Sequence, residues 1–158
     1  MVSVSIFIIV AFIASTVFIT VNEANKKAQA IRLIVDNLNF TLDGMTYRLA
    51  EGVDYYANDN ESKIEFKYLP PGGVAREIIY ELADRGNGEK SIFLTDESDP
   101  SLTRADLLSP EISIEQAKFR VITATSRSYV VISIQGKAKI GRSETKLNLQ
   151  TAVTQRNF

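Results

Sequence analysis

The sequence predicts an α+β protein in which one long N-terminal α-helix packs against a C-terminal antiparallel β-sheet domain. Three observations support this prediction. The chain begins with an uncharged apolar run, continues with apolar residues at helical spacing, and ends with short segments that alternate apolar and polar residues between turns. We therefore divide it into residues 1–21, a transmembrane or assembly helix, residues 22–52, its amphipathic continuation, and residues 53–158, a β-rich globular domain.

The composition limits the chemistry that the chain can carry out. Its 158 residues suit one domain with an appendage, and a net charge of -1 gives no overall reason to expect binding to nucleic acid. Cysteine and histidine are absent, which excludes disulfides, thiolate metal sites, Ser-His-Asp triads and ordinary zinc sites. We expect no enzyme activity, no catalytic or metal-binding residue, no cofactor and no small-molecule substrate.

The first element is a helix that suits lipid. Between Val2 and Val21 there are thirteen Val, Ile and Phe residues and no charge, Gly or Pro. Those thirteen favour membrane insertion by about 4 to 8 kcal/mol. Twelve of the twenty residues are β-branched, but a lone strand in hydrocarbon leaves its amides unpaired, so lipid favours a helix. The residues expected to face lipid or neighbouring helices are Val4, Ile6, Phe7, Ile9, Phe12, Ile13 and Phe18.

Three other interpretations of this segment are a cleaved signal peptide, a generic single-pass anchor and a buried core helix. The apolar run is long for a signal peptide, and no basic residue precedes it. A run of twenty uncharged residues also exceeds what the core of a small domain needs.

The second element continues the helix. Apolar residues follow at spacings of three and four, and Glu51-Gly52 is the expected stop, with Gly52 just past the cap. We expect this stripe to pack on the chain's own sheet, and a coiled-coil dimer is the alternative. The stripe consists of Val21, Ala24, Ala28, Ile31, Val35, Leu38, Leu42, Met45 and Leu49, and the predicted helix-to-sheet contacts are its last six members.

The third element is a set of antiparallel strands joined by short connections. A helical turn is expected within residues 102–107, and turns are expected at 85–88, 125–127 and 141–143. The acidic loop 96–100 is interpreted as solvated and not as a calcium site, because its spacing is not that of an EF-hand. The expected strands are residues 63–68, 76–83, 91–94, 112–122, 129–140 and 146–153.

Both ends of the chain resemble the type IV pilin-like superfamily, and in detail a minor pseudopilin of a type II secretion-like system. Met1-Val2-Ser3-Val4-Ser5-Ile6-Phe7 is similar to the apolar run that follows the prepilin motif Gly-Phe-Thr-Leu-x-Glu. Residues 147–157, which include Thr151, Val153, Arg156 and Asn157, are similar to the last strand of minor pseudopilins. The prepilin motif itself is missing from the sequence and would lie upstream of Met1, so no residue takes the role of its glutamate.

The resemblance implies a structural or assembly subunit of a secretion or pilus-like filament, with other pilin or pseudopilin subunits and membrane lipid as partners. It also implies a single-pass protein of the inner membrane with an extracytoplasmic β-domain, which can be incorporated into a filament or its tip. Lys26, Lys27 and Arg32 alone favour the opposite side, because basic residues usually stay cytoplasmic. The alternatives are a generic membrane-tethered binding module and a minor pilin for DNA uptake.

Overall fold

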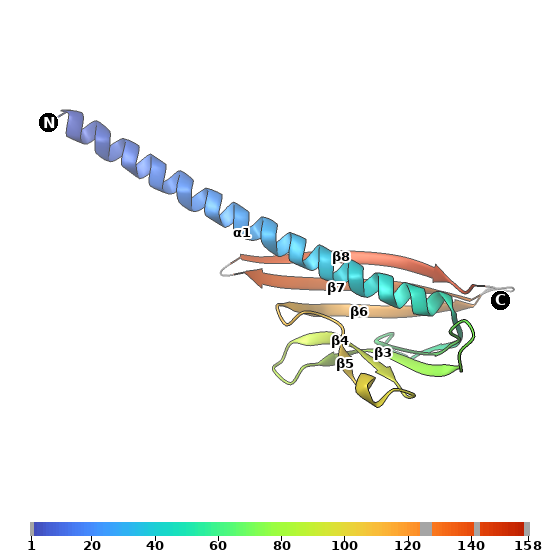
Figure 1. Ribbon diagram of the computed structural model, residues 1–158. Helices are drawn as coiled ribbons and strands as arrows, with labels where there is room; N and C mark the ends of the chain where they lie inside the picture. Colours follow the sequence, from blue (N-terminus) through green and yellow to red (C-terminus); the bar gives the residue numbers. More distant parts are fainter. Residues whose placement is uncertain (1, 124–127, 141–142, 157–158) are drawn as a thin grey trace.

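The computed structural model describes residues 2–123, 128–140 and 143–156, and it confirms the α+β fold. Helix α1 runs without a break from Val2 to Ala50, which makes it about 73 Å long. Figure 1 shows its N-terminal half projecting from the domain and its C-terminal half lying along strands β7 and β8. Gly44, the weakest helix former in α1, is accommodated inside the helix.

The strands form two antiparallel sheets (Figure 1). Sheet A has the order β1-β2-β3-β4-β5, and sheet B has the order β6-β7-β8. Within each sheet consecutive strands are neighbours, as short connections require. The bounds are β1 Gly52–Ala57, β2 Lys63–Tyr68, β3 Arg76–Asp84, β4 Lys90–Asp96, β5 Ala105–Asp106, β6 Ile112–Thr123, β7 Ser128–Ile140 and β8 Ser143–Thr154.

The long strands of sheet B present one face to the helix. In β7 the residues from Val130 to Ala138 with even numbers are buried, and their odd-numbered neighbours are more exposed. In β8 the predicted inner face holds, since Leu147 and Leu149 are partly buried and Val153 is buried. The predicted turns at 125–127 and 141–143 lie almost entirely outside the described residues.

Sheet A differs in part from the expectation. The turn at 85–88 is confirmed, because β3 and β4 pair from Ile78 and Asp96 up to Asp84 and Lys90. Strand β1 was not expected, since its sequence carries no alternating apolar pattern. The helical turn lies at Pro100–Leu102, where the Asp99 side chain accepts a hydrogen bond from the Ser101 amide, and not at 102–107.

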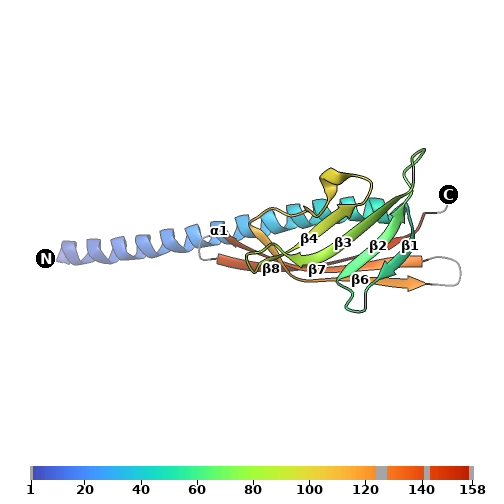
Figure 2. The same cartoon turned by 90° about the horizontal axis from the view of Figure 1, so that it is seen from below.

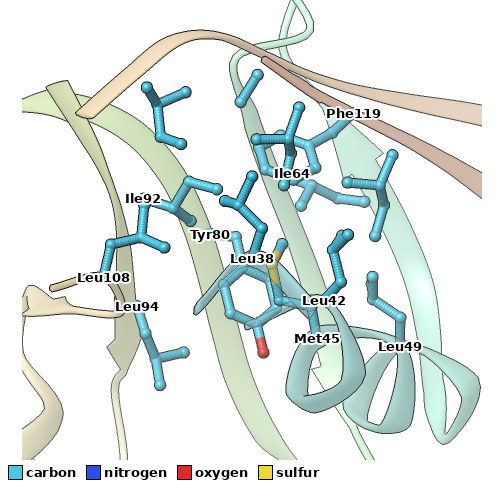
Figure 3. Packing of buried hydrophobic residues seen from close by; sticks show 14 of the residues in the cluster. Leu38, Leu42, Met45, Leu49, Ile64, Tyr80, Ile92, Leu94, Leu108 and Phe119 are labelled. Atoms are coloured by element: carbon cyan, nitrogen blue, oxygen red, sulfur yellow. The ribbon is translucent and has the colours of Figure 1, made fainter. Parts of the chain in front are cut away.

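The core lies between the second half of α1 and both sheets. Figure 3 shows Leu38, Leu42, Met45 and Leu49 of α1 facing side chains from the strands. Tyr80 is completely buried in the sheet, and its ring stacks on that of Phe66 at a centroid distance of 5.9 Å. The Tyr80 hydroxyl accepts a hydrogen bond from Arg48 at 3.2 Å, which satisfies its oxygen inside the core.

The N-terminal part of the predicted stripe is wrong. Ile31 is 42% exposed, Val35 is only partly buried, and Val21, Ala24 and Ala28 are exposed. The buried positions follow one another at spacings of four, four, four, three and four. The buried face therefore drifts around the helix relative to the predicted heptad stripe, because a straight helix crosses a twisted sheet. These positions are Ala30, Ile34, Leu38, Leu42, Met45 and Leu49, with Thr41 beside them.

Candidate membrane and assembly helix

The apolar half of α1 contacts no other part of the described chain. Every large apolar side chain that is exposed between Val2 and Val21 has an exposed fraction of at least 53%. Leaving thirteen such side chains in water would cost on the order of 20 to 40 kcal/mol. This segment therefore requires lipid or other apolar helices around it.

Its surface is apolar on all sides and not along one stripe. Phe7, Phe12 and Phe18 are 73%, 74% and 74% exposed; Phe7 and Phe18 share one face, because eleven residues make about three helical turns, and Phe12 points to another side. The remaining predicted residues of this segment are Val4, Ile6, Ile9 and Ile13, with exposed fractions of 62%, 57%, 59% and 59%. An all-round apolar helix suits a lipid bilayer or the centre of a helical bundle.

Three hydroxyl groups of the apolar half bond to its own backbone. Ser15, Thr16 and Thr20 each donate to the carbonyl oxygen four residues earlier, at 2.8, 2.9 and 3.0 Å. A hydroxyl paired in this way costs little to place in hydrocarbon, because it keeps a hydrogen bond without water. The sequence pattern did not reveal this pairing, although Ser and Thr inside an apolar helix are the signal for it.

A charged spacer separates the apolar half from the packed half. Residues 22–29 are all exposed, and Ala30 is the first buried residue of α1. Eight residues of helix span about 12 Å. Glu23, Lys26 and Lys27 in this spacer would lie at the edge of a bilayer that holds residues 2–21.

The C-terminal end of α1 is fixed to the domain by hydrogen bonds to its last carbonyl groups. The Tyr55 hydroxyl lies 2.6 Å from the carbonyl oxygens of both Leu49 and Gly52, and burial raises the pKa of Tyr55 to about 12. The Arg156 amide, just after β8, donates to the Ala50 carbonyl at 2.7 Å. The helix axis is therefore set by contacts at its end as well as along its length.

Gly52 has a role different from the predicted cap. The structure gives it no positive φ, and it opens strand β1. A Cβ at this position would lie 2.6 Å from Phe66 Cδ2 and 3.2 Å from the Leu49 carbonyl oxygen. Glycine is required here for the close approach of the helix end to β2.

The acidic loop is not solvated throughout as expected, because Asp96 is only 4% exposed and lies 3.6 Å from the Arg76 guanidinium. Asp96 accepts from the amide and hydroxyl of Ser98, and Asp99 does the same for Ser101. Asp54, in β1, pairs with Lys67 of β2 at 2.9 Å. Within the described parts of the chain, no three acidic side chains come together as metal ligands.

Among the described residues, α1 is long and apolar enough to cross a membrane once. Comparisons with protein-family models, with curated proteins and with solved structures return no match for this chain.

Proposed function

We propose that this chain is a pilin-like structural subunit: α1 holds it in the inner membrane, and the same helix packs with other subunits in a secretion or pilus-like filament. The observation that carries the proposal is the continuity of α1. One helix joins an apolar half, which contacts no other part of the described chain, to a half that packs into the core of the β-domain. A flexible tether would serve a membrane-bound module equally well, so a rigid junction favours a role in which the domain's position relative to the helix matters.

Transfer of α1 from lipid to a helical bundle is physically feasible. Both surroundings are apolar, so the helix need not meet water during assembly. Ala11 and Ser15 lie one turn apart beside Phe7 and Phe12 and leave a hollow on the helix surface. A hollow of this kind allows a neighbouring helix to approach closely.

The proposal is tested by replacing residues 2–21 with a run of twenty leucines. A polyleucine helix spans the membrane as well as the native one, and it lacks the native pattern of large and small side chains. We expect this variant, expressed in the native host, to remain in the membrane fraction and to be absent from sheared filaments seen by electron microscopy. Full function of the polyleucine variant would show that the helix is a generic anchor.

The orientation is tested separately with single cysteines, since the chain has none of its own. Asn60→Cys places a thiol on the exposed turn between β1 and β2, and Phe12→Cys places one within the apolar half. We expect a membrane-impermeant maleimide to label the first variant in intact spheroplasts and the second only after detergent is added. Labelling of Asn60→Cys only after lysis would place the domain in the cytoplasm.

A further inference from the structure

The charges of the β-domain are divided between its two halves. Residues 52–111, which include sheet A, carry thirteen carboxylates and six basic side chains, a surplus of seven negative charges. Residues 112–158, which include sheet B, carry two carboxylates and eight basic side chains, a surplus of six positive charges. The net charge of -1 hides this separation, because the two surpluses nearly cancel.

Five of these eight basic side chains lie on the face of sheet B that points away from α1. Alternation along each strand places the basic side chains of β6, β7 and β8 opposite the buried residues. Two of them are neutralised, since Arg120 pairs with Glu61 and Lys146 pairs with Glu115. Among the described residues no ion pair within 4 Å reaches the other three, Lys118, Lys137 and Lys139, although Glu144 of β8 lies opposite Lys139 in register.

The negative surplus has a matching position on sheet A. Glu77 and Glu81 of β3 are exposed and lie on the side opposite buried Ile78 and Tyr80. The register of β3 with β4 continues by one position, because the Glu97 amide donates to the Glu77 carbonyl at 3.2 Å. Lys67 and Lys63 of β2 lie opposite Glu77 and Glu81 in register, but their ion pairs are with Asp54 and Glu65. Glu77, Glu81 and Glu97 form no ion pair within 4 Å in the described chain, so this face keeps a net negative charge.

Each outer face also contains two like charges directly opposite each other. Lys137 of β7 faces Lys146 of β8 in register, and Glu77 faces Glu97 in the extended register of β3 and β4. Like charges at directly opposite positions destabilise a sheet. Glu115 beside Lys146 and Lys67 opposite Glu77 offset part of this cost within the chain, and an oppositely charged partner would offset the rest.

From these observations we infer that the basic face of sheet B, Lys118, Lys137 and Lys139, binds the acidic face of sheet A, Glu77, Glu81 and Glu97, in a second copy of this chain. The same chain carries both complementary surfaces, on two sheets that lie on different parts of the domain (Figure 2). Such a contact is heterologous, so each copy keeps one free face and further copies can add. The inference deepens the proposed function by naming the subunit's partner.

The test uses the detergent-solubilised full chain and measures self-association by sedimentation velocity. The basic-face variant is K118E/K137E/K139E, and the acidic-face variant is E77K/E81K/E97K. We expect each variant alone to associate at least about tenfold more weakly than the unaltered chain, because like-charged faces then meet. We expect an equal mixture of the two variants to associate like the unaltered chain, since each supplies the face that the other lacks.

Salt dependence and folding complete the test. Association of the unaltered chain should weaken as salt rises from about 0.02 M to 1 M, since screening shortens the range of these charges from roughly 20 Å to 3 Å. A mixture that fails to associate although both variants show native circular dichroism would overturn the inference. So would salt-independent association, or low-salt binding of a labelled DNA duplex by a chain that stays monomeric.

The outcome is separable from that of the proposed function. The charge variants leave α1 unchanged, and the polyleucine variant leaves both charged faces unchanged. Loss of filament assembly with polyleucine, together with charge variants that associate normally, would retain the assembly role and remove this contact. If a triple variant fails to fold, the single change Lys137→Glu takes its place in the test. It should not destabilise sheet B, because it replaces the repulsion between Lys137 and Lys146 by an attraction.

Discussion

The contact between Leu38 of α1 and Gly136 of β7 allows the helix-to-sheet packing to be tested at one point. A Cβ added at Gly136 would lie 2.9 Å from Leu38 Cδ1 and 3.7 Å from Ile114 Cδ1. Gly136→Ala should therefore cost about 1 to 3 kcal/mol as an overpacked core position. Leu38 is completely buried, so Leu38→Ala should cost about 2 to 5 kcal/mol through lost burial and a cavity.

The double variant is the informative measurement. Once Leu38 is shortened, the methyl group at residue 136 enters the space that it leaves, so the second substitution should cost little. We expect the double variant to cost about 1 to 3 kcal/mol less than the sum of the two single substitutions, which is within the range of coupling measured for residues in contact. Gly44→Ala is the matched control on the same helix: nothing lies within 4 Å of its added Cβ, and it should stabilise by about 0.5 to 1 kcal/mol whether or not Leu38 is present.

The assay is denaturant unfolding of the full chain in detergent, followed by near-ultraviolet circular dichroism of tyrosine. All six tyrosines lie between residues 47 and 129 and there is no tryptophan, so the signal reports on the β-domain and not on the apolar half of α1. Additive costs, within about 0.5 kcal/mol, would refute the placement of Leu38 over Gly136. An additive result for the control together with a coupled result for Gly136 would support it.

Three further predictions concern single side chains. Arg85 donates to the Asp106 carboxylate and to three carbonyls between residues 108 and 112. Arg85→Ala should therefore lower the free energy of unfolding by about 3 to 5 kcal/mol. An unchanged denaturation midpoint would show that these hydrogen bonds do not stabilise the domain. Burial alone would raise the pKa of Asp106, but hydrogen bonds from Arg85 and Ser91 outweigh it and lower that pKa. The resulting stability is present above the ordinary pKa of aspartate and is lost as pH falls through the lowered value; acid titration of unfolding should show this loss, and Asp106→Asn should remove it. Phe12→Arg should weaken membrane insertion by about 3 to 4 kcal/mol and so lower the share of the chain in the membrane fraction. Phe40→Arg, at a site 81% exposed beyond the apolar half, should leave that share unchanged, and equal partition of both variants would argue against a membrane span.

The charge pattern of the domain could have been counted from the sequence, but its meaning could not. Lys137 and Lys146 are nine positions apart in the chain, and only the pairing of β7 with β8 places them opposite each other. The same holds for Glu77 and Glu97, which become neighbours through the register of β3 and β4. Strand register depends on pairing between distant segments, so local patterns do not reveal which charges meet.

The long helix, its apolar first half and most of the strands follow from local properties of the chain. An uncharged run of twenty residues and the alternation in Lys63–Tyr68 each carry their own physical preference, for lipid and for a half-buried strand respectively. For the same reason the turn between β3 and β4 was predictable from Gly86 and Gly88, which both have positive φ.

Which face of α1 is buried, and how the strands divide into two sheets, are properties of the packed molecule. Ile34 is completely buried and Ile31 is 42% exposed, although both are isoleucines at helical spacing, because the twist of β7 and β8 sets where the helix meets the sheet. Strand β1 forms without an apolar pattern because β2 supplies its hydrogen-bond partners. Periodicity records which residues prefer to leave water, and packing selects among the arrangements that bury enough of them.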